Sequence, residues 1–83
     1  MNKRRLLQKV LSGSKNERFG DVRTLMEAFG FRVVRVSGSH HIFAHPEVPE
    51  LVNIQDRKGK AKPYQIRQFL QLVEQYNLWF GDE

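Results

Sequence analysis

Apolar side chains recur with a helical period in three segments of the chain. In residues 3–11 they gather on one side and basic residues on the other, which predicts a short amphipathic helix. A second helix is expected over residues 21–29, with Asp21 as its N-cap and Gly30 as its C-terminal stop. The strongest amphipathic pattern begins at a proline and covers residues 63–77, so this last segment is also predicted to be helical.

Between the second and third of these segments, the chain is rich in β-branched and aromatic residues, which favour strands. Residues 31–36 and 40–45 predict a hairpin around the Ser-Gly-Ser turn at 37–39, and Pro46 should end the second strand because proline cannot donate to a ladder. Residues 51–55 fit a third strand. The order of elements predicts an α+β domain: a three-stranded antiparallel sheet with helices on one face and an extra N-terminal helix.

The chain is short, and its composition is that of a folded protein. It has 83 residues, of which 40% are hydrophobic, enough for one modest core. We expect a single domain over residues 1–83, made of a basic helical arm at 1–19, a core at 20–78 and a tail at 79–83. The absence of cysteine excludes disulfides, zinc ribbons and thiol nucleophiles.

The net charge is strongly positive for so short a chain. The chain has fourteen Lys and Arg and nine Asp and Glu, which gives a formal net charge of +5. Such a charge favours a polyanionic partner such as nucleic acid. A charge excess that only increases solubility gives the same count, so this observation is weak on its own. No apolar run approaches the roughly 20 residues of a membrane helix, and we expect a cytoplasmic protein with no membrane partner.

Three histidines lie close together, at positions 40, 41 and 45, which raises the question of a metal site. Successive side chains of a strand point to opposite faces, so His40 cannot readily share an ion with His41. His41 and His45 share a face but lie about 13 Å apart along the strand, whereas ligands of one zinc ion lie within about 4 Å of each other. We therefore expect no metal and no other cofactor.

His40 follows a glycine-containing turn and is a candidate general base, because histidine exchanges a proton near neutral pH. RNA carries its own nucleophile in the 2′-hydroxyl. Strand cleavage then needs a base for that proton and cations for the phosphorane charge, but no metal. The alternative is a histidine that only makes a structural hydrogen bond within the turn.

The second candidate feature is the basic segment at residues 57–62, here named the lysine loop, which leads into the last predicted helix. Its three lysines, Lys58, Lys60 and Lys62, stand before a helix N-terminus. Free N–H groups and the helix dipole favour phosphate at such a position, and the lysines add charge to it. The alternative is a solvated run of charge on a loop.

Four short motifs occur together, in one order, within residues 12–78. They are Gly30-Phe31, Gly38-Ser39-His40-His41-Ile42-Phe43, His45-Pro46 and Gly59-Lys60-Ala61-Lys62-Pro63-Tyr64. Their order and spacing resemble the HicA toxin family of type II toxin–antitoxin systems, and the two longer motifs together are far more specific than either alone. The resemblance implies a fold similar to the double-stranded-RNA-binding domain, metal-independent ribonuclease activity on mRNA, and neutralisation by a HicB-type antitoxin.

The resemblance also assigns a catalytic residue. In the family the catalytic histidine follows a Gly-Ser or Gly-Gly turn, which here makes it His40. We expect the RNA-binding residues to be Ser39, His41, Lys58, Lys60 and Lys62. The general acid stays open between His41, a lysine and water, and no carboxylate is clearly placed to orient His40. The alternative function is a non-catalytic RNA-binding module in which the lysine loop reads A-form phosphate geometry.

Overall fold

The computed structural model describes residues 3–13 and 17–80. Its elements are α1 (Lys3–Leu11), α2 (Phe19–Ala28), β1 (Arg32–Ser37), β2 (His40–His45), β3 (Val48–Arg57), β4 (Lys60–Ala61) and α3 (Pro63–Gln75). The strands form one antiparallel sheet in the order β1-β2-β3-β4. The predicted α+β class is confirmed, and the arrangement is consistent with a fold like that of the double-stranded-RNA-binding domain.

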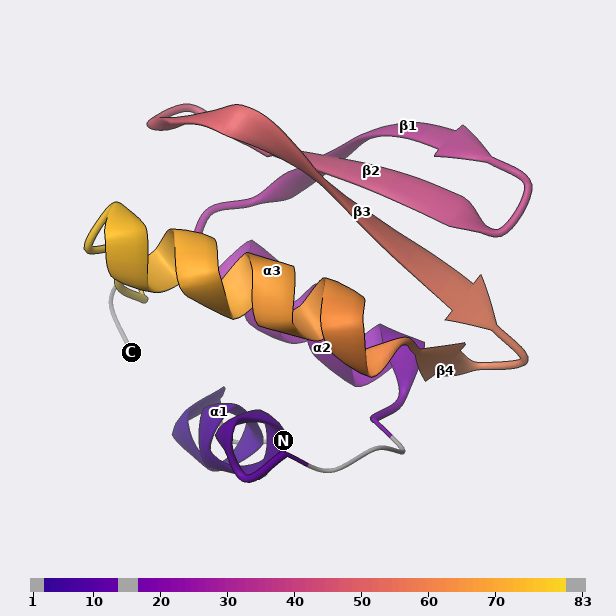
Figure 1. Cartoon of the computed structure of the whole chain (residues 1–83), viewed down its shortest axis with the longest axis horizontal. Helices are drawn as coiled ribbons and strands as arrows, with labels where there is room; N and C mark the ends of the chain where they lie inside the picture. The colour runs from indigo at the N-terminus through magenta and orange to yellow at the C-terminus, as the bar shows by residue number, and fades with distance from the viewer. Residues whose placement is uncertain (1–2, 14–16, 81–83) are drawn as a thin grey trace.

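The elements stack in three layers (Figure 1). The sheet is one layer, α2 and α3 cover one of its faces, and α1 packs beneath these helices, away from the sheet. The apolar side chains of the sheet and of α2 and α3 meet in a single core, whose largest fully buried members include Phe31, Phe43, Phe69, Leu25 and Met26. No described helix has the length and apolar character needed to cross a membrane.

The N-terminal arm joins the core through α1. Leu6 and Val10, one turn apart, are buried in the same cluster as the side chains of α2. Next to them, Lys9 Nζ lies 3.7 Å from Oε1 of Glu17, whose side chain is completely buried. α1 therefore extends the core beyond the two helices that cover the sheet.

The other face of the sheet, which we call the outer face, is covered by no described helix (Figure 1). Cross-strand partners share a face, and Phe43 points into the core, so the register shows which side chains point outward. Three rows cross the outer face: Arg35–Ile42–Asn53, Ser37–His40–Gln55 and Arg57–Lys60. Apart from Ile42, the residues of these rows are polar or basic, and none is acidic.

The sheet has four strands rather than the predicted three. Lys60–Ala61, which we expected in a loop, pairs with Asp56 and Arg57 as β4. A strand of two residues is too short to show the alternation by which strands are recognised. The preceding turn has positive φ at Lys58 (52°) and Gly59 (83°), as in hairpin turns of type I′, and the Asp56 carboxylate accepts the Gly59 N–H at 2.8 Å.

α2 begins earlier than predicted. Its N-cap is Arg18, not Asp21, and no side chain caps its first turn. Tertiary contacts explain the earlier start, because Phe19 is buried in the core and its N–H donates to the carbonyl of Gly59 at 2.9 Å. Asp21 lies instead within the first turn, where its negative charge is still favourable at the positive end of the helix dipole.

The C-terminal end of α3 is tied to β3 through a phenol–carboxylate contact. The Tyr76 hydroxyl donates to Oε1 of Glu50 at 2.7 Å. This hydrogen bond, with partial desolvation and the negative charge of Glu50, raises the pKa of Tyr76 above its ordinary value of 10.0. A raised tyrosine pKa stabilises the fold below the unfolded-state pKa, and the contribution is lost as the pH rises through the folded-state pKa.

We expect Tyr76 to ionise at higher pH in the folded chain than in the chain unfolded by urea. Ultraviolet absorbance of the phenolate, measured in a Tyr64→Phe background, isolates this titration. Glu50→Gln should bring the folded-state pKa of Tyr76 down because it removes the negative charge beside the hydroxyl. Identical titrations with and without Glu50 would contradict the contact.

Candidate functional site

His40 begins β2 directly after a two-residue turn, and its side chain is exposed on the outer face. Gly38 occupies the first turn position with a φ of 58°, a conformation that favours glycine in tight hairpins. The ring is held on one side, with Nδ1 3.2 Å from Oδ1 of Asn53. Because an amide oxygen only accepts hydrogen bonds, this contact places a proton on Nδ1, and in the neutral ring Nε2 is then the acceptor.

Asn53 is an orienting residue that the sequence analysis missed. It lies on β3, diagonal to His40, whose direct cross-strand partner is Gln55. The only signal in the sequence was a polar residue inside an otherwise apolar segment. Which strand face that residue occupied, and which histidine it met, depended on the register between β2 and β3.

Hydrogen bonds made by two glutamines link the row Ser37–His40–Gln55 to the first turn of α3. The side chain of Gln55 donates from Nε2 to Oγ of Ser39 at 3.1 Å, and its backbone N–H donates to Oε1 of Gln65 at 2.7 Å. Gln65 is only 3% exposed, so a buried side chain of the helix accepts the backbone N–H of Gln55 at the edge of β3. Neither Gln55 nor Gln65 was predicted from the sequence, and together they hold the N-terminus of α3 near the row of His40.

The lysines of the lysine loop take three different positions. Lys58 is exposed in the β3–β4 turn, Lys60 is exposed in β4, and Lys62 is half-buried as the N-cap residue of α3. Lys60 pairs with Arg57 in the row next to that of His40, so the register places Lys60 and His40 on the same outer face. The predicted base and one predicted phosphate ligand thus lie on the same face of the sheet, with β3 between their strands.

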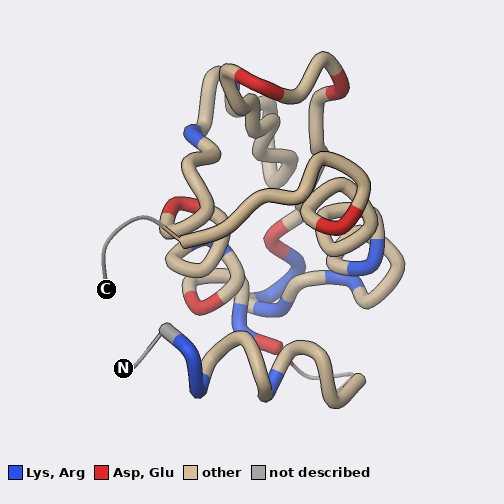
Figure 2. Tube along the Cα trace, turned by 90° about the vertical axis from the view of Figure 1, so that its left-hand side faces the viewer, with Lys and Arg blue, Asp and Glu red and all other residues tan. Residues whose placement is uncertain are grey.

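The electrostatics of this end of the molecule favour an anion. The first turn of α3 contains no acidic residue and carries the positive end of the helix dipole, while Pro63 has no N–H and the N–H groups of Gln65 and Ile66 donate to the Lys62 carbonyl. Glu47 and Glu50 lie at the opposite end of β3, near the β2–β3 turn at the top of Figure 2, whereas Arg57, Lys58 and Lys60 lie at this end of the strand. The charge is therefore distributed unevenly along the sheet.

His41 does not join His40. It points to the inner face, where its ring centroid lies 4.5 Å from that of Phe19, and its Nδ1 lies 3.2 Å from the carbonyl oxygen of Ser39. The two adjacent histidines therefore occupy opposite faces of the sheet, as strand alternation predicts. Ser39 is half-buried in the turn and contacts the backbone of β3.

His45 is held by main-chain groups at the other end of β2. Its Nε2 lies 2.9 Å from the Phe29 carbonyl oxygen, and its Nδ1 accepts the Glu47 N–H at 3.0 Å. Both ring nitrogens are thereby occupied. Over residues 3–13 and 17–80, no three His, Asp or Glu side chains are grouped closely enough to hold a metal ion.

Comparison with known families tests the resemblance. The family model described as HicA toxin of bacterial toxin–antitoxin systems matches residues 19–74, well over half of the chain. The matched part begins with α2 and ends within α3, so it contains His40, Asn53 and the lysine loop but not α1. No curated protein matches the chain. The family match confirms the resemblance, and the chain belongs to the HicA toxin family.

Proposed function

We propose that this toxin is a metal-independent endoribonuclease that cleaves mRNA, with His40 as its general base. The observation that carries the proposal is the contact between His40 Nδ1 and Asn53 Oδ1, which leaves Nε2 as an exposed acceptor. Nε2 takes the proton of a ribose 2′-hydroxyl, the 2′-oxygen bonds to the adjacent phosphorus, and the bond to the 5′-oxygen breaks. The product carries a 2′,3′-cyclic phosphate, or the monophosphate left by its hydrolysis.

Cations around His40 stabilise the charge that develops on phosphorus. Lys60 lies on the same face, and Lys62 stands at the N-terminus of α3, where the positive end of the helix dipole adds to its charge. The leaving 5′-oxygen takes its proton from a lysine of this loop or from water, since His41 lies on the opposite face of the sheet. Membership of the HicA family implies a HicB-type antitoxin as the partner that neutralises the toxin.

The test is cleavage of a single-stranded transcript by the purified chain in the presence of EDTA. We expect discrete fragments that end in a 2′,3′-cyclic phosphate, and no cut at a position where the 2′-hydroxyl is replaced by hydrogen. Cleavage of the deoxy-substituted strand would contradict the use of the 2′-oxygen as nucleophile. Binding without cleavage, in EDTA and in magnesium alike, would favour the non-catalytic RNA-binding module instead.

Lys60→Ala and Lys62→Ala should each weaken RNA binding and reduce its dependence on salt. A lysine that neutralises one phosphate contributes about 0.7 to 1 unit to the slope of log K against log salt. The measurement is fluorescence anisotropy with an uncleavable 2′-O-methyl RNA at several salt concentrations. Arg23→Ala, an equal loss of charge at an exposed residue of α2, is the control and should leave the slope unchanged. Unchanged slopes in both lysine variants would remove the lysine loop from the interface.

A further inference from the structure

β1 is an edge strand, and its free side has no strand partner among the described residues (Figure 1). An edge strand exposes backbone N–H and C=O groups that can pair with a strand from another chain. The sequence of β1, RVVRVS, is rich in β-branched residues and suits such pairing. The edge is therefore a candidate site for strand addition.

The helices do not cover β1. Val34 and Val36 are 59% and 56% exposed, although valine is usually buried in strands. The register shifts between Val33 and Arg35, which makes Val34 the extra residue of a β-bulge. Beyond the bulge, three consecutive residues up to Ser37 pair regularly with β2, so this part of the strand has regular backbone geometry.

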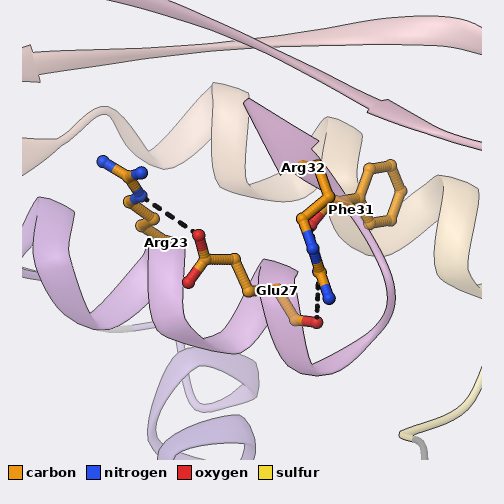
Figure 3. A network of polar contacts seen from close by, with 4 residues as sticks. All are labelled: Arg23, Glu27, Phe31 and Arg32. Carbon is orange, nitrogen blue, oxygen red and sulfur yellow. Dashed lines mark hydrogen bonds and ion pairs between the residues drawn. The ribbon is translucent and has the colours of Figure 1, made fainter. Parts of the chain in front are cut away.

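The charge of β1 indicates what could pair with it. Arg32 is already engaged, because its Nη1 donates to the carbonyls of Glu27 at 2.9 Å and Phe31 at 2.7 Å (Figure 3). Arg23 holds the Glu27 carboxylate, at 3.3 Å. Arg35, by contrast, is exposed on the outer face and makes no hydrogen bond or ion pair with a described residue.

We propose that β1 binds a strand of an acidic partner protein in which Asp or Glu alternates with apolar residues. Its acidic side chains would point to the outer face beside Arg35, and its apolar side chains would lie on the inner face beside Val36. A second copy of this chain is the less favourable occupant, because β1 has two arginines and no acidic residue to match them.

An added strand would also affect the RNA site, a consequence that rests on the proposed function. It would lie two strand spacings, about 10 Å, from β2. Its carboxylates would stand on the same face as Arg35 and His40, where the proposed function places RNA phosphates. An acidic strand on β1 therefore competes with RNA.

The free part of β3 is a weaker candidate for the same kind of binding. A cavity of about 330 Å³ lies between it and α3, with the side chains of Gln68, Gln71 and Gln75 along the helix. These amides are uncharged and do not select one class of partner. The backbone N–H of Gln55 is moreover already bound to Gln65.

The experiment uses the full chain and a capped seven-residue peptide that alternates Glu and Val. Amide hydrogen exchange followed by NMR should slow at alternate residues of β1 when millimolar peptide is added, and stay unchanged at Leu51 on β3. Arg35→Glu should weaken binding by roughly tenfold, because an attractive cross-strand pair becomes repulsive. Arg57→Glu, the same reversal on β3, is the matched control and should change the affinity little.

Two further peptides separate strand addition from simple charge attraction. A peptide of the same sequence with N-methylated alternate residues keeps the carboxylates but cannot pair, so it should leave exchange in β1 unchanged. A Lys-Val peptide should bind more weakly than the Glu-Val peptide.

Three results would overturn the proposal. The first is unchanged exchange in β1 with the Glu-Val peptide, and the second is equal slowing by the N-methylated peptide. The third is slowing that grows with the concentration of the chain alone, which would make a second copy the occupant. None of these measurements contains RNA, so they fail or succeed independently of the proposed nuclease.

Discussion

His40→Ala should reduce RNA cleavage by about 10²- to 10⁴-fold, the usual contribution of a well-placed general base. Without the imidazole, no described residue beside this position on the outer face offers a ring nitrogen that can accept the proton. The polar group that contacts the ring is the side-chain amide oxygen of Asn53. The measurement is the initial rate of cleavage of a single transcript in EDTA. RNA binding should change little, since the lysine loop stays intact.

The neighbouring histidine is the matched control for this prediction. His41→Gln removes an imidazole from the opposite face of the sheet and should keep most of the activity, once thermal unfolding shows that the variant is folded. Asn53→Ala should give an intermediate loss in cleavage with unchanged RNA affinity, because it frees the ring without removing it. Equal cleavage by wild type and His40→Ala would assign the base elsewhere, and His41→Ala would be the next variant.

Gly30→Ala should lower the free energy of unfolding by about 2 to 4 kcal/mol, the largest effect we expect from one methyl group. Gly30 has a φ of 99°, which strains any residue with a Cβ atom. An added Cβ would lie 2.8 Å from Nε2 of His45, the atom that meets the Phe29 carbonyl at 2.9 Å. The substitution therefore adds backbone strain and displaces a ring that joins β2 to the end of α2.

Two other glycines separate these contributions in urea unfolding. Gly38 has a φ of 58° but nothing within 4 Å of an added Cβ, so Gly38→Ala should cost only the backbone strain. Gly20 lies in α2 with open space around it, and Gly20→Ala should stabilise the chain by roughly 0.5 to 1 kcal/mol. Equal losses for Gly30→Ala and Gly38→Ala would mean that the His45 contact adds nothing.

Combining Gly30→Ala with His45→Ala tests the same contact in a different way. His45→Ala alone should destabilise the chain, because the Phe29 carbonyl and the Glu47 N–H both lose their partner. Once the ring is absent, Gly30→Ala should cost less than in the wild type, since only backbone strain remains. Additive losses would contradict a clash between the Gly30 position and the ring.

The sequence by itself determined the local elements of this protein. An amphipathic helix, or a hairpin around a glycine turn, is determined by residues that lie close together in the sequence. For this reason α1, α3 and the β1–β2 hairpin were predictable. Strand alternation also put His40 and His41 on opposite faces. The motifs around His40 and the lysine loop were enough to indicate the family that the match over residues 19–74 establishes.

Only the tertiary structure decided how these elements meet. β4 exists because two residues after a turn pair with the end of β3, and α2 begins at Phe19 because that side chain reaches the core. The contact of His40 with Asn53, thirteen residues later, depends on the register between β2 and β3. Which face of the sheet stays open likewise depends on where α2 and α3 pack. Such contacts join residues that are distant in the sequence, and a local sequence pattern does not determine which distant residues will meet.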